Sequence, residues 1–290
     1  MDNKRLNMQI DSQEVVNTQD KVIVRNAAIV EYHGAHFHGW QRQKHHPEPT
    51  IQAALEDALS RVANEPIAVT CAGRTDAGVH ASTQVIHFDT HAIRRPHNWM
   101  MGVNTYLPDG IALRWISEID QSFHARFGAT SRRYRYLIFN KEIKQGLMHD
   151  QLTWCRFPLD ENRMHEAAQS LLGEHDFTSY RAKDCQAKSP VRTIQDISVR
   201  RYGDIVMIEV QANAFLYHMI RNIAGVLMPI GMGRKPIEWS GTLLAQKDRA
   251  LGGVTAPSAG LYFVGVEYPV EFAVPSQAWG PVFVEPWFAK

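Results

Sequence analysis

The chain has 290 residues, which suits one large or two medium domains. Its composition, with 44% hydrophobic and 21% charged residues, excludes a disordered polypeptide. A formal charge of +1 excludes a protein that coats nucleic acid through global basicity, so an anionic partner must be bound by local patches. Such patches are the cluster Arg132, Arg133 and Arg135 and the pairs Arg94 with Arg95 and Arg200 with Arg201.

The first half of the chain alternates strands with helices. Residues 1–21 are polar, lack periodicity and are expected to form a disordered tail. Thr50 is positioned to cap a helix whose apolar residues recur every three or four positions, and Pro66 is expected to end it. The predicted elements are a strand over 22–32, a helix over 51–63, strands over 66–73 and 83–90, a helix over 96–106 and a strand over 111–119.

The second half repeats this pattern without a repeat of sequence. Gly203 and Asp204 form the turn of a predicted hairpin. The predicted elements are strands over 131–139, 193–202, 205–212 and 260–268, and helices over 160–172, over 215–229 and from about Pro236.

Mixed helices and hairpins favour an α+β fold of two similar α/β halves that share an extended, mainly antiparallel sheet. We expect the helices on one face and a ligand-binding cleft on the other. The expected division is an N-terminal half over 22–125, a C-terminal half over 126–269 and an extension over 270–290 that wraps the surface.

The cysteines Cys71, Cys155 and Cys185 are far apart and form no C-x-x-C pair, so neither a thiolate zinc site nor a disulfide framework is expected. The first 21 residues contain no apolar stretch of signal-peptide length, and nowhere do about 18 apolar residues run together. A reducing, cytoplasmic location is the expectation.

The run GRTDAGVHA at residues 73–81 is the most informative motif, because it places Asp76 on a glycine-flanked loop between two predicted strands. A carboxylate there can serve as nucleophile, general base or metal ligand, or can simply form a turn. The spacing alone leaves these alternatives open.

This run, with CA before it and STQVIHF after it, resembles the catalytic segment of the TruA family of tRNA pseudouridine synthases. Four further runs agree with the family in order: GWQRQ at 39–43, FHARFGATSRRYRY at 123–136, NAFLYHMIRN at 213–222 and GLYFVGV at 260–266. The resemblance implies that uridine becomes pseudouridine at positions 38, 39 and 40 of the tRNA anticodon stem-loop. It also implies a homodimer in which one tRNA spans both subunits, with no cofactor and no metal.

Asp76 matches the essential aspartate of the family, which either attacks C1′ of the nucleoside or removes its 2′ proton. Arg221 matches the partner of that carboxylate, and a neighbouring arginine lowers a carboxyl pKa by about 1 to 3 units. Because Arg221 lies in the apolar run FLYHMIRNIAGVLMPI, an unpaired guanidinium there is costly and a buried ion pair is expected.

The resemblance also implies residues that bind the substrate. Arg74 matches the residue that helps the target base to leave the RNA stack, Tyr134 matches the motif tyrosine that stacks on uracil, and Leu261 closes the apolar side of the pocket. Arg132 and Arg133 are expected to contact phosphates. Alternation along a strand, however, places Arg133 on the face opposite Tyr134.

The sequence departs from the family in one loop, where His33 replaces a usual Asp and His38 a common Tyr. A rival hypothesis is therefore a metal hydrolase with His33, His36 and His38 as ligands, although no acidic residue follows until Glu48. An aspartyl phosphotransferase is a second rival, but Gly78 stands where its second acidic residue belongs. An RNA-binding module without catalysis is the third.

Overall fold

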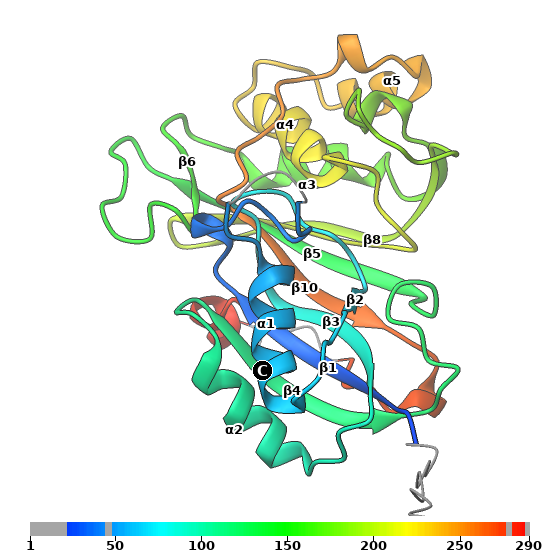
Figure 1. Cartoon of the computed structure of the whole chain (residues 1–290). Coiled ribbons are helices and arrows are strands. Elements are labelled where there is room, and N and C mark those ends of the chain that lie inside the picture. Colours follow the sequence, from blue (N-terminus) through cyan, green and yellow to red (C-terminus); the bar gives the residue numbers. More distant parts are fainter. Residues whose placement is uncertain (1–21, 44–47, 277–279, 288–290) are drawn as a thin grey trace, which may run out of the picture.

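The computed structural model describes residues 22–43, 48–276 and 280–287, so the predicted tail over 1–21 lies outside the described residues. The described strands form one ten-stranded sheet in the order β4-β1-β3-β10-β5-β9-β8-β7, with β2 on β3 and β6 on β5 (Figure 1). The strands are β1 (Val24–Tyr32), β2 (Thr70–Cys71), β3 (His80–Thr90), β4 (Ile111–Ile119), β5 (Ser131–Asn140), β6 (Thr153–Cys155), β7 (Gly173–Asp176), β8 (Val191–Tyr202), β9 (Ile205–Ala212) and β10 (Leu261–Glu267).

Helices pack on this sheet in two groups. Helices α1 and α2 lie over the strands of the first half, and α3, α4 and α5 gather over the second half (Figure 1). The α-helices are α1 (Ile51–Ala63), α2 (Pro96–Tyr106), α3 (Glu161–Gln169), α4 (Met219–Gly231) and α5 (Trp239–Gln246). Short 3-10 turns are η1 (Gly34–His36), η2 (Thr178–Tyr180), η3 (Arg249–Leu251), η4 (Val270–Phe272) and η5 (Val282–Trp287). None of the helices in the described ranges is long and apolar enough to cross a membrane.

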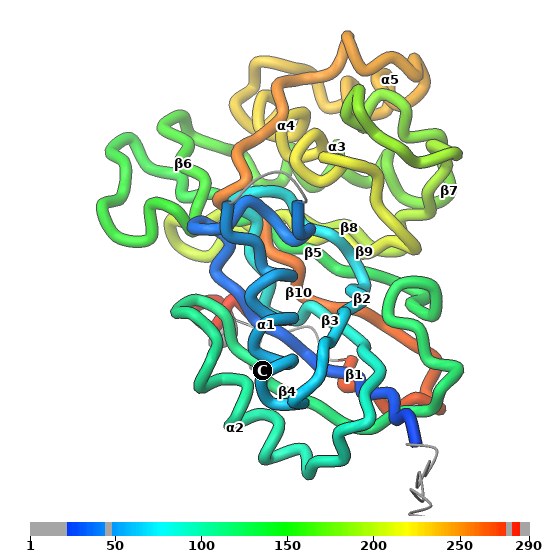
Figure 2. Tube along the Cα trace, in the orientation of Figure 1, coloured from blue at the N-terminus to red at the C-terminus, as the bar shows by residue number. Residues whose placement is uncertain are grey.

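Strand β10 joins the two halves. It comes from the end of the chain, yet it lies between β3, to which it is parallel, and β5, to which it is antiparallel (Figure 2). Its register pairs Phe263 with both Ala81 and Tyr134. The other pairings are antiparallel except β5 with β6, so the predicted α+β class with a mainly antiparallel sheet is confirmed. The sheet is continuous between the halves, and the division near residue 125 stays a prediction.

The helix ends follow local rules, with some differences from prediction. The Thr50 hydroxyl caps α1 by accepting the Ala53 N–H, and the helix ends at Ala63 as predicted, although the residue that ends it is Asn64, in left-handed conformation with φ 59°, and not Pro66. Helix α4 begins four residues later than predicted because His218 adopts φ 59° just before it. It also continues two residues beyond Pro229, because the fixed φ of proline is helical and only the last turn loses a hydrogen bond.

Strand β5 has two different faces. Tyr134 and Tyr136 point to the larger core, whereas Arg133 and Arg135 point to the opposite face and share the carboxylate of Glu209. On that opposite face a smaller apolar cluster is closed by the C-terminal extension: Leu137, Met207, Tyr262 and Val264 pack with Val284 of η5.

Candidate active site

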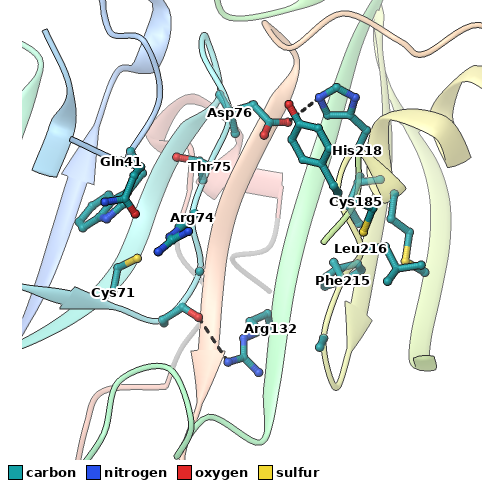
Figure 3. A pocket seen from close by; sticks show the side chains of 18 of the residues that line it. Gln41, Cys71, Arg74, Thr75, Asp76, Arg132, Cys185, Phe215, Leu216 and His218 are labelled. Carbon is teal, nitrogen blue, oxygen red and sulfur yellow. Dashed lines mark hydrogen bonds and ion pairs between the residues drawn. The ribbon is translucent and has the colours of Figure 1, made fainter. Parts of the chain in front are cut away.

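A cleft of about 1090 Å³ lies between the two halves, above the centre of the sheet (Figure 3). Its lining includes Asp76 from the β2–β3 loop, Tyr134 of β5, Gln52 of α1 and Ile220 of α4. Because residues of α1 and α4 line it, the cleft opens on the same face of the sheet as the helices. The prediction that it lies on the opposite face is therefore wrong: the helices of the two halves stand apart and form its walls.

The loop that carries Asp76 is held by buried side chains below it. The Gln84 amide accepts the Gly73 N–H (3.3 Å) and donates to the Gly73 carbonyl (2.5 Å) and to the Tyr32 hydroxyl (3.3 Å). The Tyr32 and Thr75 hydroxyls are in turn 2.7 Å apart. Gln84 and Tyr32 are buried, so this chain of hydrogen bonds fixes the loop on both sides of Arg74.

A second loop packs against the first so closely that glycine is needed. Gly39 has φ +80°, and a Cβ there would lie 2.8 Å from the Thr75 carbonyl oxygen, which accepts the Trp40 N–H at 3.0 Å. The GWQRQ run therefore buttresses the loop that carries Asp76.

The Asp76 carboxylate faces two side chains from the start of α4. Its Oδ2 lies 3.3 Å from Nε2 of His218 (Figure 3). The same oxygen lies 3.6 Å from Nη1 of Arg221. Nε of Arg221 donates to the Ala256 carbonyl at 2.7 Å, which fixes the direction of the guanidinium. Each of these two side chains thus approaches Asp76 at the same oxygen, Oδ2.

His218 was missed by sequence reasoning. The sequence feature that could have identified His218 is its position in the NAFLYHMIRN run, three residues before Arg221. Side chains three residues apart lie on one face of a helix. Its left-handed backbone, immediately before α4, turns the imidazole toward Asp76.

Burial shifts the pKa values of Asp76 and His218. Removal from water raises the pKa of the Asp76 carboxyl above its usual value, while His218 and Arg221 oppose the rise. Burial likewise lowers the pKa of His218, against the attraction of Asp76. The predicted ion pair exists and Arg221 lowers the pKa of Asp76 as expected, but desolvation outweighs it, so the net direction is upward.

Aromatic rings form the floor of the cleft beside Asp76. Tyr134 is only 9% exposed; its ring stacks on Phe263 with centroids 4.7 Å apart and meets Phe215 edge to face at 5.0 Å. Leu261, at the start of β10, lines the same wall and is buried. Phe215 and Phe263 were not named as site residues, although both lie in the runs shared with the family.

The cleft is locally basic although the protein is nearly neutral. Its lining contains the arginines Arg74, Arg126, Arg132 and Arg192 against the acids Asp76 and Asp184. Arg74 is exposed, and its side chain makes no hydrogen bond or ion pair within the described part of the chain, so its donors are available to a ligand.

Arg132 lines the cleft but is largely committed to the protein. Its guanidinium donates to the carbonyls of Ala72 (3.3 Å), Arg126 (2.5 Å), Ala129 (3.3 Å) and Asn213 (2.8 Å). It thereby ties the strand before the Asp76 loop to two other walls of the cleft.

Arg133 does not reach the cleft. Its guanidinium donates to Glu209 at 2.6 Å and to Asp196 at 3.3 Å on the opposite face, as strand alternation indicates. Arg133 therefore does not line the cleft that holds Asp76, unlike Arg132, with which the prediction grouped it. A contact from Arg133 to an RNA phosphate elsewhere stays a prediction.

The histidines of the rival metal site are divided. His33 and His36 lie close to Asp150, whereas His38 pairs with Glu48 at 3.1 Å. The three histidines named by the rival hypothesis therefore do not converge.

Comparisons with known proteins agree along most of the chain. A family profile described as tRNA pseudouridine synthase matches residues 28–128 and 167–269. A protein of Photorhabdus laumondii named "tRNA pseudouridine synthase A" is 54% identical over 255 residues, covering 88% of this chain and 96% of that protein. Proteins of the same name from Pseudoalteromonas atlantica (53% over 261 residues, covering 90% and 98%) and Cronobacter sakazakii (50% over 265 residues, covering 91% and 97%) are similar to it.

Proposed function

Because this chain belongs to the TruA family of tRNA pseudouridine synthases, we propose that its cleft binds the anticodon stem-loop of tRNA and isomerises uridines 38, 39 and 40. The protein is an isomerase. The observation that carries the assignment of Asp76 as the reacting group is that its carboxylate lines the cleft and is held there by His218 and Arg221.

The reaction breaks the bond from C1′ to N1, turns the uracil over and joins C5 to C1′. C5 loses its hydrogen as a proton and N1 gains one, so the product is an isomer of the substrate. The Asp76 carboxylate either attacks C1′ as N1 leaves, and is later displaced by C5, or removes the 2′ proton and returns it. Both routes regenerate the carboxylate, and neither needs a cofactor.

The surrounding residues prepare the carboxylate for this task. A partly dry carboxylate is less stabilised by water and is therefore a stronger nucleophile or base than an exposed one. Arg221 and His218 keep it ionised and oriented. The fixed loop between Gly73 and Thr75 holds it still, which lowers the entropy lost when the substrate is aligned.

The substrate pocket follows from the other side chains. The target base must leave the RNA stack to reach Asp76, and the Tyr134 ring with Leu261 offers an apolar surface for the uracil. Arg74, with donors available, is suited to a phosphate or to the space the base leaves. Arg126, exposed at the rim, is a second phosphate contact.

A cytoplasmic homodimer with one tRNA across both subunits completes the proposal. It is supported by membership of the family, and light scattering of the protein with and without tRNA tests it.

The decisive experiment uses tRNA transcribed with uridine tritiated at C5, because bonding C5 to C1′ expels that hydrogen. Wild-type protein should release tritium to water, and Asp76→Ala should release none while it retains its fold and most of its tRNA affinity. Asp184→Ala is the matched control, since Asp184 is an exposed acid in the same cleft. It should stay active.

Full release by Asp76→Ala would falsify the role of Asp76. No release by wild type on several tRNAs, with binding intact, would instead favour an RNA-binding module without catalysis.

A further inference from the structure

A second cluster of chemically active side chains lies outside the cleft. His33, His36 and Asp150 each offer one ligand atom, and these atoms all lie within 4.8 Å of one another. They come from the end of β1, from η1 and from the segment between β5 and β6, and none of them lines the cleft that holds Asp76. The active site therefore does not explain why they are together.

His33 is the centre of this cluster. Its Nε2 is buried, and no hydrogen-bond partner is found for it in the described ranges. That nitrogen lies 3.5 Å from Oδ2 of Asp150. This distance is close to the separation of two ligand atoms that bind one metal ion in tetrahedral geometry. Zinc–ligand bonds of about 2.0 to 2.1 Å place two tetrahedral ligand atoms about 3.3 Å apart. A buried, unsatisfied nitrogen facing a carboxylate at this spacing is arranged as a metal ligand would be.

His36 supplies the third donor. Its side chain is exposed, and its ring centroid lies 5.6 Å from that of His33. Its ligand atom lies within 4.8 Å of those of His33 and Asp150, so this exposed imidazole completes the donor set.

His80 holds the ligands in place from the second layer. Its Nδ1 accepts the Gly34 N–H at 3.1 Å, so its Nε2 carries the hydrogen, facing the carbonyls of Asp150 (3.0 Å) and Ala259 (3.1 Å). One ring thus ties the η1 segment to the Asp150 segment. With both nitrogens occupied, His80 is a support for the site and not a ligand.

We propose that His33, His36 and Asp150 bind a zinc-type divalent transition-metal ion, with water as the fourth ligand. Two imidazoles and one carboxylate are a donor set that zinc accepts at four-coordinate sites. Magnesium is disfavoured, because it prefers six oxygen ligands in octahedral geometry.

The proposed ion has a structural role. It joins η1 to the segment that carries Asp150, two parts of the chain that are far apart in sequence. Gly34 of η1 packs so tightly on Val79 that a Cβ there would lie 2.0 Å from the Val79 carbonyl oxygen. Val79 belongs to the loop that carries Asp76, and its N–H donates to the Asp76 carbonyl at 3.2 Å. Binding therefore stabilises the outer side of the catalytic loop without taking part in the reaction.

The test is calorimetric titration of the full-length protein, free of any affinity tag, with Zn²⁺. Wild type should bind one equivalent, and its Tm should rise by about 5 °C at a hundredfold excess of Zn²⁺ over Kd. Mg²⁺ should produce no such rise. His36→Gln and Asp150→Asn should each weaken Zn²⁺ binding at least tenfold; His36 is exposed, so its replacement leaves the fold intact.

His38→Gln is the matched control, because His38 is an exposed histidine of the same loop whose partner is Glu48. It should bind Zn²⁺ as wild type does. The proposal is overturned if wild type binds no stoichiometric Zn²⁺, or if binding is lost in His38→Gln and kept in His36→Gln. Tritium release does not enter this test, so its outcome is independent of the catalytic proposal.

Discussion

Replacing Arg221 by glutamine removes the positive charge that opposes protonation of Asp76. Opposite charges about 4 Å apart attract by about 4 kcal/mol at an effective dielectric constant near 20. The Nη1–Oδ2 distance of 3.6 Å is in this range, but Asp76 is a quarter exposed, so water replaces part of the lost interaction. We therefore expect the pKa of Asp76 to rise further, because about half of this attraction, about 2 kcal/mol, is lost.

The direction of the kinetic effect follows from the ionised form that catalysis requires. Burial already raises the pKa of Asp76, and loss of Arg221 raises it further. The acid limb of the pH profile of kcat/KM should therefore move to higher pH. Tritium release from tRNA labelled at C5, measured across pH with substrate below KM, reports this limb directly.

Two variants separate charge from other causes. Arg221→Lys keeps the positive charge and should leave the acid limb near that of wild type, although it loses the Nε contact to Ala256. Arg200→Gln removes an exposed charge of β8 outside the cleft lining and should leave the limb unchanged. An acid limb in Arg221→Gln that coincides with wild type would refute the reasoning.

Three further predictions concern rate and stability. Asp76→Asn should raise Tm at alkaline pH, because the pKa of Asp76 is higher in the folded than in the unfolded protein and the ionised carboxylate therefore destabilises the fold. This gain in Tm should fade as pH falls through the folded pKa, and thermal melts over a pH series measure it. Tyr134→Ala should slow tritium release more than Tyr134→Phe, because the ring carries the stacking; equal losses would assign the role to the hydroxyl. Glu209→Gln should lower the free energy of unfolding by about 3 kcal/mol in urea titrations, because it removes the carboxylate shared by Arg133 and Arg135; an unchanged midpoint would contradict this.

Features governed by neighbouring residues could be predicted from the sequence. The cap at Thr50 depends on a hydroxyl within three residues of the amide that donates to it. The opposite orientation of Arg133 and Tyr134 depends only on strand alternation. Asp76 was found through a motif contained in nine consecutive residues. In each case the interacting groups are close in the chain.

Only the tertiary structure decided the contacts between segments that are far apart in the chain. The order of the strands, with β10 inserted between β3 and β5, brings the Asp76 loop beside the start of α4 and so gives the carboxylate His218 as well as Arg221. The same packing sets the burial that raises the pKa of Asp76, opens the cleft between the helices and carries Asp150 to His33. Local periodicity fixes which face a side chain occupies, but burial and partners depend on which segments the sheet places side by side.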